Sequence, residues 1–334
     1  MIEAAHRIGT CFHFMSAWQV FAMSRWHQQW ILQWHGCFSV NREANDLAAF
    51  KTAIELLRTG KHPLVIFPEG DIYHSNDRVT PFRDGAAAIA MSAAKKSDRK
   101  IYFLPAALKC FYTRDPTAKL LVLTGRLEES LHWRPRTDLP LDERIYRIAG
   151  GLLTLKELEY LDGPRAGSIK DRIAELTHSV LSRLEVSYQV RNPAGFVPER
   201  VKELRRAVIQ RAEQADVTEQ RREQLNRDMD DLFFVIQLFS YPGDYLQSAP
   251  SIERIAETLD KFDEDVLRSA YPSVHGERRV VVRFGEPLEV PAQRSGRDAV
   301  AEWTNRLESS VQSLLDQTLA ENSAVTLSAG SPTE

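Results

Sequence analysis

The sequence predicts an α/β fold with a mixed, mostly parallel sheet that is flanked by helices, together with a large helical insertion or subdomain. Up to about Gly125, short apolar runs alternate with segments of helical periodicity, a pattern typical of parallel strands joined by crossover helices. From about Leu139 to Ala270 the chain holds long charged helices and almost no strand signal. Strand character returns at Arg279.

The first part of the chain supplies most of the predicted sheet. A helix is expected over residues 42–59, where apolar side chains recur at helical spacing before Gly60. A strand over 64–67 follows, and the alanine-rich segment 85–96 predicts a helix that can approach the sheet closely. Further strands are expected over residues 101–104 and 120–123.

The middle of the chain predicts amphipathic helices. One begins at Ser168 and carries a single apolar face, another runs on from Pro198, and a third spans residues 251–267. A strand over 279–284 and a helix over 298–319 then complete the fold. The small-residue segment 323–334 is expected to be disordered.

Composition excludes several classes of protein. The 43 basic and 46 acidic residues leave no basic surplus, so nucleic acid is not an expected partner. Three cysteines, none of them closely spaced, argue against a disulfide framework and a zinc site, and they fit the cytosol. No apolar run reaches the length of a membrane span, and no secretory signal is visible at Met1.

The stretch Phe67-Pro68-Glu69-Gly70 is the strongest candidate for a functional loop. It follows a buried apolar run, and Arg78, Arg83 and the start of the alanine-rich helix come next. A carboxylate, a glycine, two arginines and a helix N-terminus are together suited to an anionic, polyhydroxylated ligand. Glu69 has a plainer alternative role, which is to accept hydrogen bonds from the amides of a neighbouring loop.

Two blocks resemble signatures of the glycerophospholipid acyltransferase family, of the 1-acylglycerol-3-phosphate type. These are Phe67 to Gly70 and the earlier block that begins at Gly36 and ends at Arg42; the apolar strand ending at Pro105 is a weaker match. The resemblance implies transfer of a fatty acyl group from acyl-CoA or acyl carrier protein to a glycerol phosphate or lysophospholipid, without a cofactor. It implies that both blocks surround the phosphate and glycerol of the acceptor, with Arg42 at the phosphate. The strand ending in Gly285-Glu286-Pro287 also resembles a late strand of that domain, which favours an inserted helical region.

One family feature is missing from this sequence. The family's catalytic block, His-x-x-x-x-Asp, occurs at none of the nine histidines. Two explanations compete: an inactive relative that binds lipid or acts as a scaffold, or a chain whose native start lies upstream of Met1. The second is favoured, because residues 1–7 read as the end of a helix without a start signal. His74 and Asp77 form the one nearby pair able to imitate a base and its carboxylate, and Asp71 replaces the family's usual threonine.

A dense aromatic stretch precedes the first block. Trp26, Trp30 and Trp34 recur four residues apart on one helical face. Such a stripe predicts burial between helix and sheet, which is the favoured interpretation. The alternatives are an acyl-chain groove or a peripheral contact with the cytosolic membrane surface, where indole rings are common. The oligomeric state cannot be read from the sequence.

These observations divide the chain into four parts. The sequence predicts an acyltransferase-like α/β region over residues 1–135, a helical insertion over 136–275, the last strand and helix of the α/β domain over 276–322, and the tail over 323–334.

Overall fold

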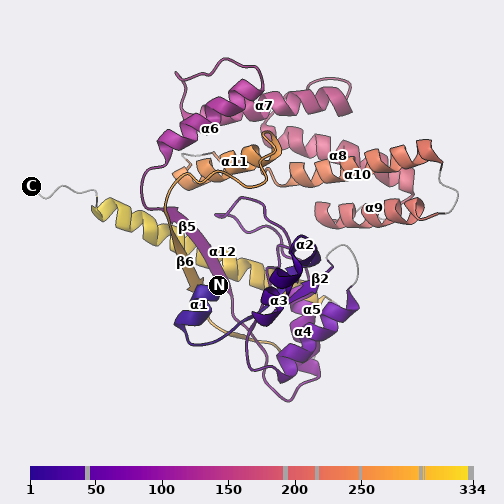
Figure 1. The fold of residues 1–334 in the computed structure, drawn as a ribbon, viewed down its shortest axis with the longest axis vertical. Coiled ribbons are helices and arrows are strands. Elements are labelled where there is room, and N and C mark those ends of the chain that lie inside the picture. The colour runs from indigo at the N-terminus through magenta and orange to yellow at the C-terminus, as the bar shows by residue number, and fades with distance from the viewer. Residues whose placement is uncertain are drawn as a thin grey trace, which may run out of the picture. The chain divides into compact units, whose positions relative to one another are not determined.

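The computed structural model describes residues 1–41, 46–190, 195–214, 218–247, 250–292, 296 and 298–329, with side chains up to residue 322 (Figure 1). The chain forms two compact units. The α/β unit comprises Met1–Ile72, Asn76–Phe111 and Arg278–Glu334, and the helical unit comprises Tyr73–Ser75 and Tyr112–Glu277. The helical unit is thus an insertion in the chain of the α/β unit.

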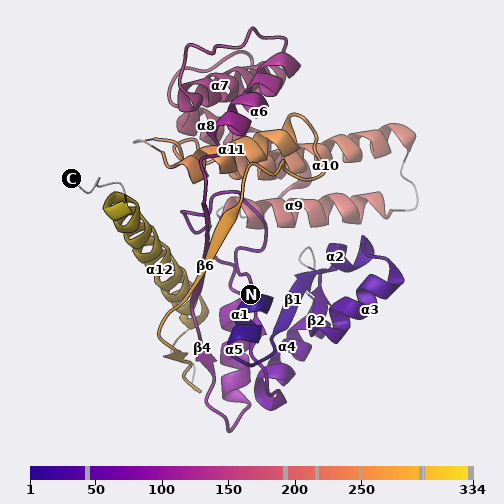
Figure 2. The ribbon, with the colours of Figure 1, turned by 60° about the vertical axis from the view of Figure 1, so that its left-hand side comes forward.

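A three-stranded parallel sheet organises the first part of the α/β unit. Its strands are β1 (His13–Ala17), β2 (Cys37–Val40) and β3 (Leu64–Val65), in the order β2-β1-β3. Phe14 is paired with Cys37 and also with Val65, so β1 lies in the middle; Figure 2 shows β1 beside β2. Parallel strands need crossover connections. Helices α2 (Trp18–Ala22) and α3 (Trp26–Trp34) join β1 to β2, and α4 (Leu47–Thr59) joins β2 to β3.

Small side chains allow close helix packing in this unit. Helix α5 (Gly85–Lys95) packs against α4 and α12 (Ala299–Ala329), and three of its four buried alanines join Ile89 in the core cluster of this unit. The side chain of Asp46 caps α4 by accepting a hydrogen bond from the Ala49 amide at 2.9 Å. The predicted helices over 42–59 and 85–96 are therefore confirmed where the structure describes them. The short helix α1 (Ile2–Arg7) precedes β1.

Segments after the insertion complete the α/β unit. Strand β4 (Tyr102–Phe103) pairs antiparallel with β7 (Leu288–Glu289), and β5 (Ala106–Tyr112) pairs with β6 (Arg278–Phe284). The fold class predicted from the sequence is therefore confirmed: an α/β fold with a small, mostly parallel sheet, further short strand pairs and a helical insertion. Helix α12 continues to Ala329, beyond the predicted end at 319 and into the segment expected to be disordered.

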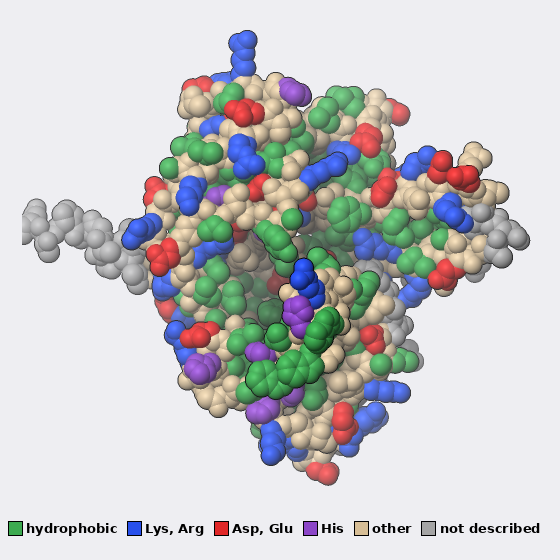
Figure 3. Space-filling view, viewed as in Figure 1, with side chains coloured by type: hydrophobic (Ala, Val, Ile, Leu, Met, Phe, Trp, Pro, Cys, Tyr) green, Lys and Arg blue, Asp and Glu red, His purple; other side chains and the backbone are tan. Residues whose placement is uncertain are grey.

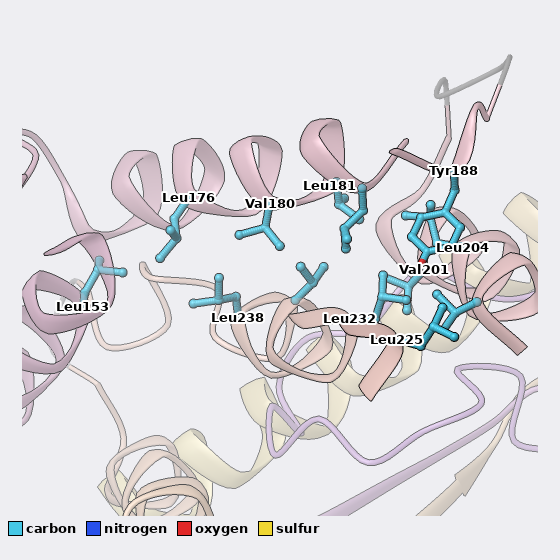
Figure 4. Packing of buried hydrophobic residues seen from close by; sticks show 13 residues of the cluster. Leu153, Leu176, Val180, Leu181, Tyr188, Val201, Leu204, Leu225, Leu232 and Leu238 are labelled. Carbon is cyan, nitrogen blue, oxygen red and sulfur yellow. The ribbon is translucent and has the colours of Figure 1, made fainter. Parts of the chain in front are cut away.

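The helical unit is built from six helices of the described chain. They are α6 (Thr117–Ser130), α7 (Leu141–Tyr160), α8 (Ile169–Tyr188), α9 (Val197–Ala212), α10 (Glu219–Phe239) and α11 (Ile252–Asp265). Side-chain oxygens of Ser168 and Ser251 cap α8 and α11, at the positions where the sequence places their starts. Figure 4 shows leucines and valines of α8, α9 and α10 meeting in one core, with Leu153 of α7 beside them.

One predicted strand is wrong. Residues 120–123 lie in α6, not in the sheet. The buried positions Leu120, Leu123, Thr124 and Leu127 follow the spacing i, i+3, i+4, i+7, which is helical. Because α6 packs on α7 and α11, residues from Tyr112 onward belong to the helical unit, whereas the sequence predicts the boundary at residue 136.

Candidate functional site: the loop after strand β3

The Phe67-Pro68-Glu69-Gly70 stretch forms a tight turn directly after β3. The Gly70 amide donates to the Phe67 carbonyl at 3.1 Å, and Gly70 has φ of +76°. Residues with a Cβ rarely adopt this left-handed conformation, so the turn needs its glycine. We refer to residues 67–70 as the acceptor loop, after the role that the family resemblance implies for them.

Arg83 lies across the acceptor loop. Its amide donates to the Pro68 carbonyl at 2.9 Å, and a Cβ added to Gly70 would lie only 2.5 Å from the Arg83 Nε. The guanidinium therefore rests against the bare Cα of Gly70, where a larger residue would push it away. The absence of a side chain at Gly70 thus leaves room for the Arg83 guanidinium at the turn.

Glu69 is half-buried beside this arginine-bearing segment. Its Oε2 accepts a hydrogen bond from the Thr80 amide at 2.9 Å, which is the role in a neighbouring loop that the sequence offers as the alternative. Burial raises the pKa of the Glu69 carboxyl above its usual 4.5, the hydrogen bonds from Thr80 oppose this, and the Glu308 charge adds to it. A carboxylate held in this way has its orientation fixed by the protein.

The raised pKa of Glu69 predicts a pH dependence of stability. In the window just above pH 4.5 the folded chain holds a proton at Glu69 that the unfolded chain releases, so the contribution of Glu69 to stability falls as pH rises through this window. We expect the free energy of unfolding of the wild type, minus that of Glu69→Gln, to decrease from about pH 4 to about pH 7. Urea unfolding of both proteins at several pH values measures it. A difference that rises with pH would contradict the assigned direction.

The segment between the acceptor loop and α5 is held by side chains of β5 and α12. The Asp77 carboxylate forms an ion pair with Lys109 of β5, and both side chains are almost fully buried. Two side chains of α12 hold the backbone: Gln312 Oε1 accepts from the Val79 amide at 2.8 Å, and Glu308 Oε2 accepts from the Phe82 amide at 2.9 Å. These contacts fix the segment that carries Arg83 and the exposed Arg78.

The two signature blocks lie at the same edge of the parallel sheet. The acceptor loop follows β3, and Asn41 follows β2, so both leave the carboxyl ends of strands that flank β1. Open α/β sheets bind ligands at this edge. Gly36 begins the other block with φ of +78°, and a Cβ there would lie 2.9 Å from the Phe12 carbonyl oxygen. Arg42 lies outside the described residues.

The pair His74 and Asp77 has other partners. The His74 Nε2 lies 3.1 Å from the Glu264 carboxylate in the helical unit, while Asp77 is paired with Lys109 in the α/β unit. Sequence reasoning misses Lys109, Glu308, Gln312 and Glu264 as partners of this region. They lie far along the chain, and no local pattern marks them.

The tryptophan stripe of α3 faces solvent, which contradicts the favoured prediction of burial. Trp26, Trp30 and Trp34 are 81%, 64% and 75% exposed, and the rings of Trp30 and Trp34 stack at 6.4 Å. Figure 3 shows hydrophobic side chains gathered on this face over α3. No side chain of the nine-residue helix α3 is buried, so this helix does not cover a core. We call these three residues the tryptophan face.

One protein family matches the first third of the chain. Residues 1–109 match the family model described as Acyltransferase, and the match includes the block at Gly36 and the whole acceptor loop. This part of the chain is therefore similar to acyltransferases. Comparison with curated proteins and with solved structures gave no match.

The family match ends close to a boundary between the α/β unit and the helical unit. The family match ends at Lys109, and the second segment of the α/β unit ends at Phe111. Apart from Tyr73–Ser75, the helical unit lies outside the acyltransferase match. Within the described residues, no helix combines the length and apolarity needed to cross a membrane, and no cluster of His, Cys, Asp and Glu is placed to hold a metal ion.

Proposed function

We propose that this acyltransferase-family chain moves a fatty acyl group from acyl-CoA or acyl carrier protein to a glycerol phosphate or lysophospholipid. The main support is the position of the Arg83 guanidinium, which packs against Gly70 at the carboxyl edge of the parallel sheet. The Glu69 carboxylate, whose orientation is fixed by the Thr80 amide, belongs to the same loop. A guanidinium offers paired donors to a phosphate, and a carboxylate accepts from a glycerol hydroxyl. The proposal needs no metal and no bound cofactor.

Acyl transfer to an alcohol also needs a base for the hydroxyl proton and donors for the oxyanion. This sequence has no His-x-x-x-x-Asp block, and the structure pairs His74 with Glu264. This favours a second candidate function: a relative that keeps the acceptor site and binds lipid, or acts as a scaffold, without turnover.

Arg83 provides the test of the acceptor site. We expect Arg83→Gln to weaken binding of lysophosphatidic acid by about tenfold to a hundredfold, because a hydrogen bond to a charged group contributes about 1.5–3 kcal/mol. Arg7→Gln is the control, since Arg7 is exposed and pairs only locally with Glu3. Isothermal titration calorimetry measures both. Equal affinity of Arg83→Gln and wild type would remove Arg83 from the acceptor site.

The acyl-transfer assay separates the two candidate functions. Transfer from oleoyl-CoA to lysophosphatidic acid is measured for this chain and for a chain extended with any in-frame codons upstream of Met1. Transfer that depends on Arg83 supports the enzyme. Binding that depends on Arg83, without transfer by either chain, supports the binding protein instead.

We propose further that the tryptophan face contacts the cytosolic surface of a membrane, and that the protein works there. Exposed indole rings favour the membrane interface, and residues 1–41 carry two arginines against one glutamate. The alternative is that these rings line the path of the acyl chain.

Replacing Trp26, Trp30 and Trp34 together by alanine is expected to lower partitioning onto phosphatidylcholine–phosphatidylglycerol vesicles by about tenfold or more. Tyr271→Ala is the matched control, because Tyr271 is an equally exposed aromatic residue of the helical unit. Vesicle co-sedimentation measures partitioning. If vesicle binding is unchanged and only the KM for acyl-CoA rises, the rings serve the acyl chain and not the membrane.

A further inference from the structure

The helical unit contains a cavity that no step of the proposed function uses. Its volume is about 590 Å³, within the usual range of small-molecule sites. The lining residues come from α7, α8, α10 and α11, from the turn after α10 and from Tyr73 and His74, and all of them belong to the helical unit.

The lining presents hydrocarbon to a ligand. Ile145, Leu152, Ile173, Phe234 and Leu246 contribute aliphatic and aromatic carbon. The hydroxyl of Tyr241 donates to Asp265 at 2.7 Å, and that of Tyr160 donates to Asp231 at 2.8 Å. Because these two hydroxyls already have protein partners, a ligand meets the rings of Tyr241 and Tyr160 and not their polar atoms. An apolar cavity of this kind favours apolar occupants over water.

The charges of the lining do not favour an anionic head group. Lys156 pairs with Glu159 at 2.7 Å, and Lys261 pairs with Asp265 at 3.3 Å. The His74 ring lies 3.1 Å from the Glu264 carboxylate. Asp230 adds a further carboxylate to the lining. A free carboxylate or phosphate monoester would therefore meet no surplus of positive charge here.

The cavity reaches the surface between α7 and α10. Leu155 of α7 and Phe233 of α10 both line it, and they are 59% and 56% exposed. Large apolar side chains at such a mouth let a long chain enter from solvent while its head group stays in water.

We propose that this cavity binds the hydrocarbon chain of a single-chain lipid whose head group is uncharged or zwitterionic. The site goes beyond the proposed acyl transfer, since it uses no residue of the acceptor loop and, apart from Tyr73 and His74, its lining lies outside the acyltransferase match. A single chain fits the cavity volume, and the lack of surplus positive charge in the lining disfavours an anionic head group.

Binding of lysophosphatidylcholine with a 16-carbon chain to the full-length protein, below its micelle concentration, tests the proposal. Ala149 of α7 lines the cavity, and Ala149→Phe places a ring where the chain would lie. We expect this variant to bind about tenfold more weakly or worse, while lysophosphatidic acid binding that depends on Arg83 is retained. Unchanged affinity for lysophosphatidylcholine in folded Ala149→Phe overturns the proposal.

A matched pair of leucines keeps the test valid if Ala149→Phe does not fold. Leu155 and Leu158 lie on the same helix and are 59% and 57% exposed, but only Leu155 lines the cavity. We expect Leu155→Asp to weaken binding by about tenfold and Leu158→Asp by less than about twofold. Equal effects of the two substitutions overturn the proposal.

Two further readouts locate the lipid and identify its head group. A lysophosphatidylcholine with a diazirine at the chain end should label peptides of α7 and α10 after irradiation. Labelling confined to residues 1–41 assigns the lipid to the tryptophan face and overturns the proposal. Palmitate should bind more weakly than lysophosphatidylcholine, and tighter binding of palmitate contradicts the assigned head group.

Discussion

Lys109→Met is expected to lower the free energy of unfolding of the α/β unit by about 3–5 kcal/mol, because it leaves the Asp77 carboxylate buried without its cation. Asp77 lies in the segment that carries Arg83, whose backbone α12 also holds through Gln312 and Glu308. The variant should therefore also weaken binding of lysophosphatidic acid. Urea unfolding followed by tryptophan fluorescence measures the first effect, since five of the six tryptophans belong to the α/β unit.

The control for Lys109→Met is Lys100→Met in the same unit. The Lys100 Nζ lies 3.1 Å from the Glu289 carboxylate, but both side chains are exposed, so we expect a loss below about 1 kcal/mol. Adding Asp77→Asn to Lys109→Met should restore much of the lost stability, because it removes the unpaired charge. If Lys109→Met and Lys100→Met have equal effects, the pair does not anchor the segment.

Arg144→Met is expected to destabilise the helical unit by a similar amount, about 3–5 kcal/mol. The Arg144 guanidinium makes two hydrogen bonds to the Glu128 carboxylate, at 3.2 and 2.6 Å, and both side chains are buried between α6 and α7. Removing the cation leaves Glu128 in an apolar core with one long hydrogen bond from the Arg136 amide, at 3.4 Å. Urea unfolding followed by far-ultraviolet circular dichroism, which is dominated by the helices, measures the loss.

Arg147→Met is the matched control for Arg144→Met. The Arg147 Nη1 lies 3.9 Å from the same carboxylate, but its side chain is 38% exposed and stacks on Trp133. We expect its loss to cost about 1 kcal/mol or less. The double variant Glu128→Leu with Arg144→Met should be far more stable than Arg144→Met alone. A result in which Arg147→Met is the more damaging substitution would refute the assignment of Arg144.

Elements with a strong period or a clear start could be predicted from the sequence. Helix α8 has a capping serine and one apolar face, and α5 has its run of alanines; both occur where they are expected. Short strands are harder. Strand β1 has five half-buried residues with no alternation of apolar and polar side chains, and β5 was not predicted either. The run at Leu120 has strand-like residues, but packing on α7 and α11 makes it helical.

The candidate site divides in the same way. The turn at Gly70 and the neighbouring Arg83 follow from local sequence, because a glycine at a strand end and a nearby arginine are visible in the chain. Their supports do not follow, because Gln312 lies 233 residues from Val79 and Glu264 lies 190 residues from His74. The tryptophan face was predicted to be buried because apolar stripes usually cover a core. Here the small sheet leaves α3 without one.

The discontinuity of the α/β unit has a consequence for the order in which the protein is made. Tyr102 of β4 pairs with Glu289 of β7, 187 residues later, and the whole of Tyr112–Glu277 is synthesised between them. Domains generally fold as units while the chain emerges. The helical unit therefore has its complete chain outside the ribosome while the core around Ile89 still lacks Val290 and Ala299. The α/β unit, whose synthesis begins first, can therefore complete its fold only after the helical unit, because the segment after the acceptor loop needs its contacts with α12.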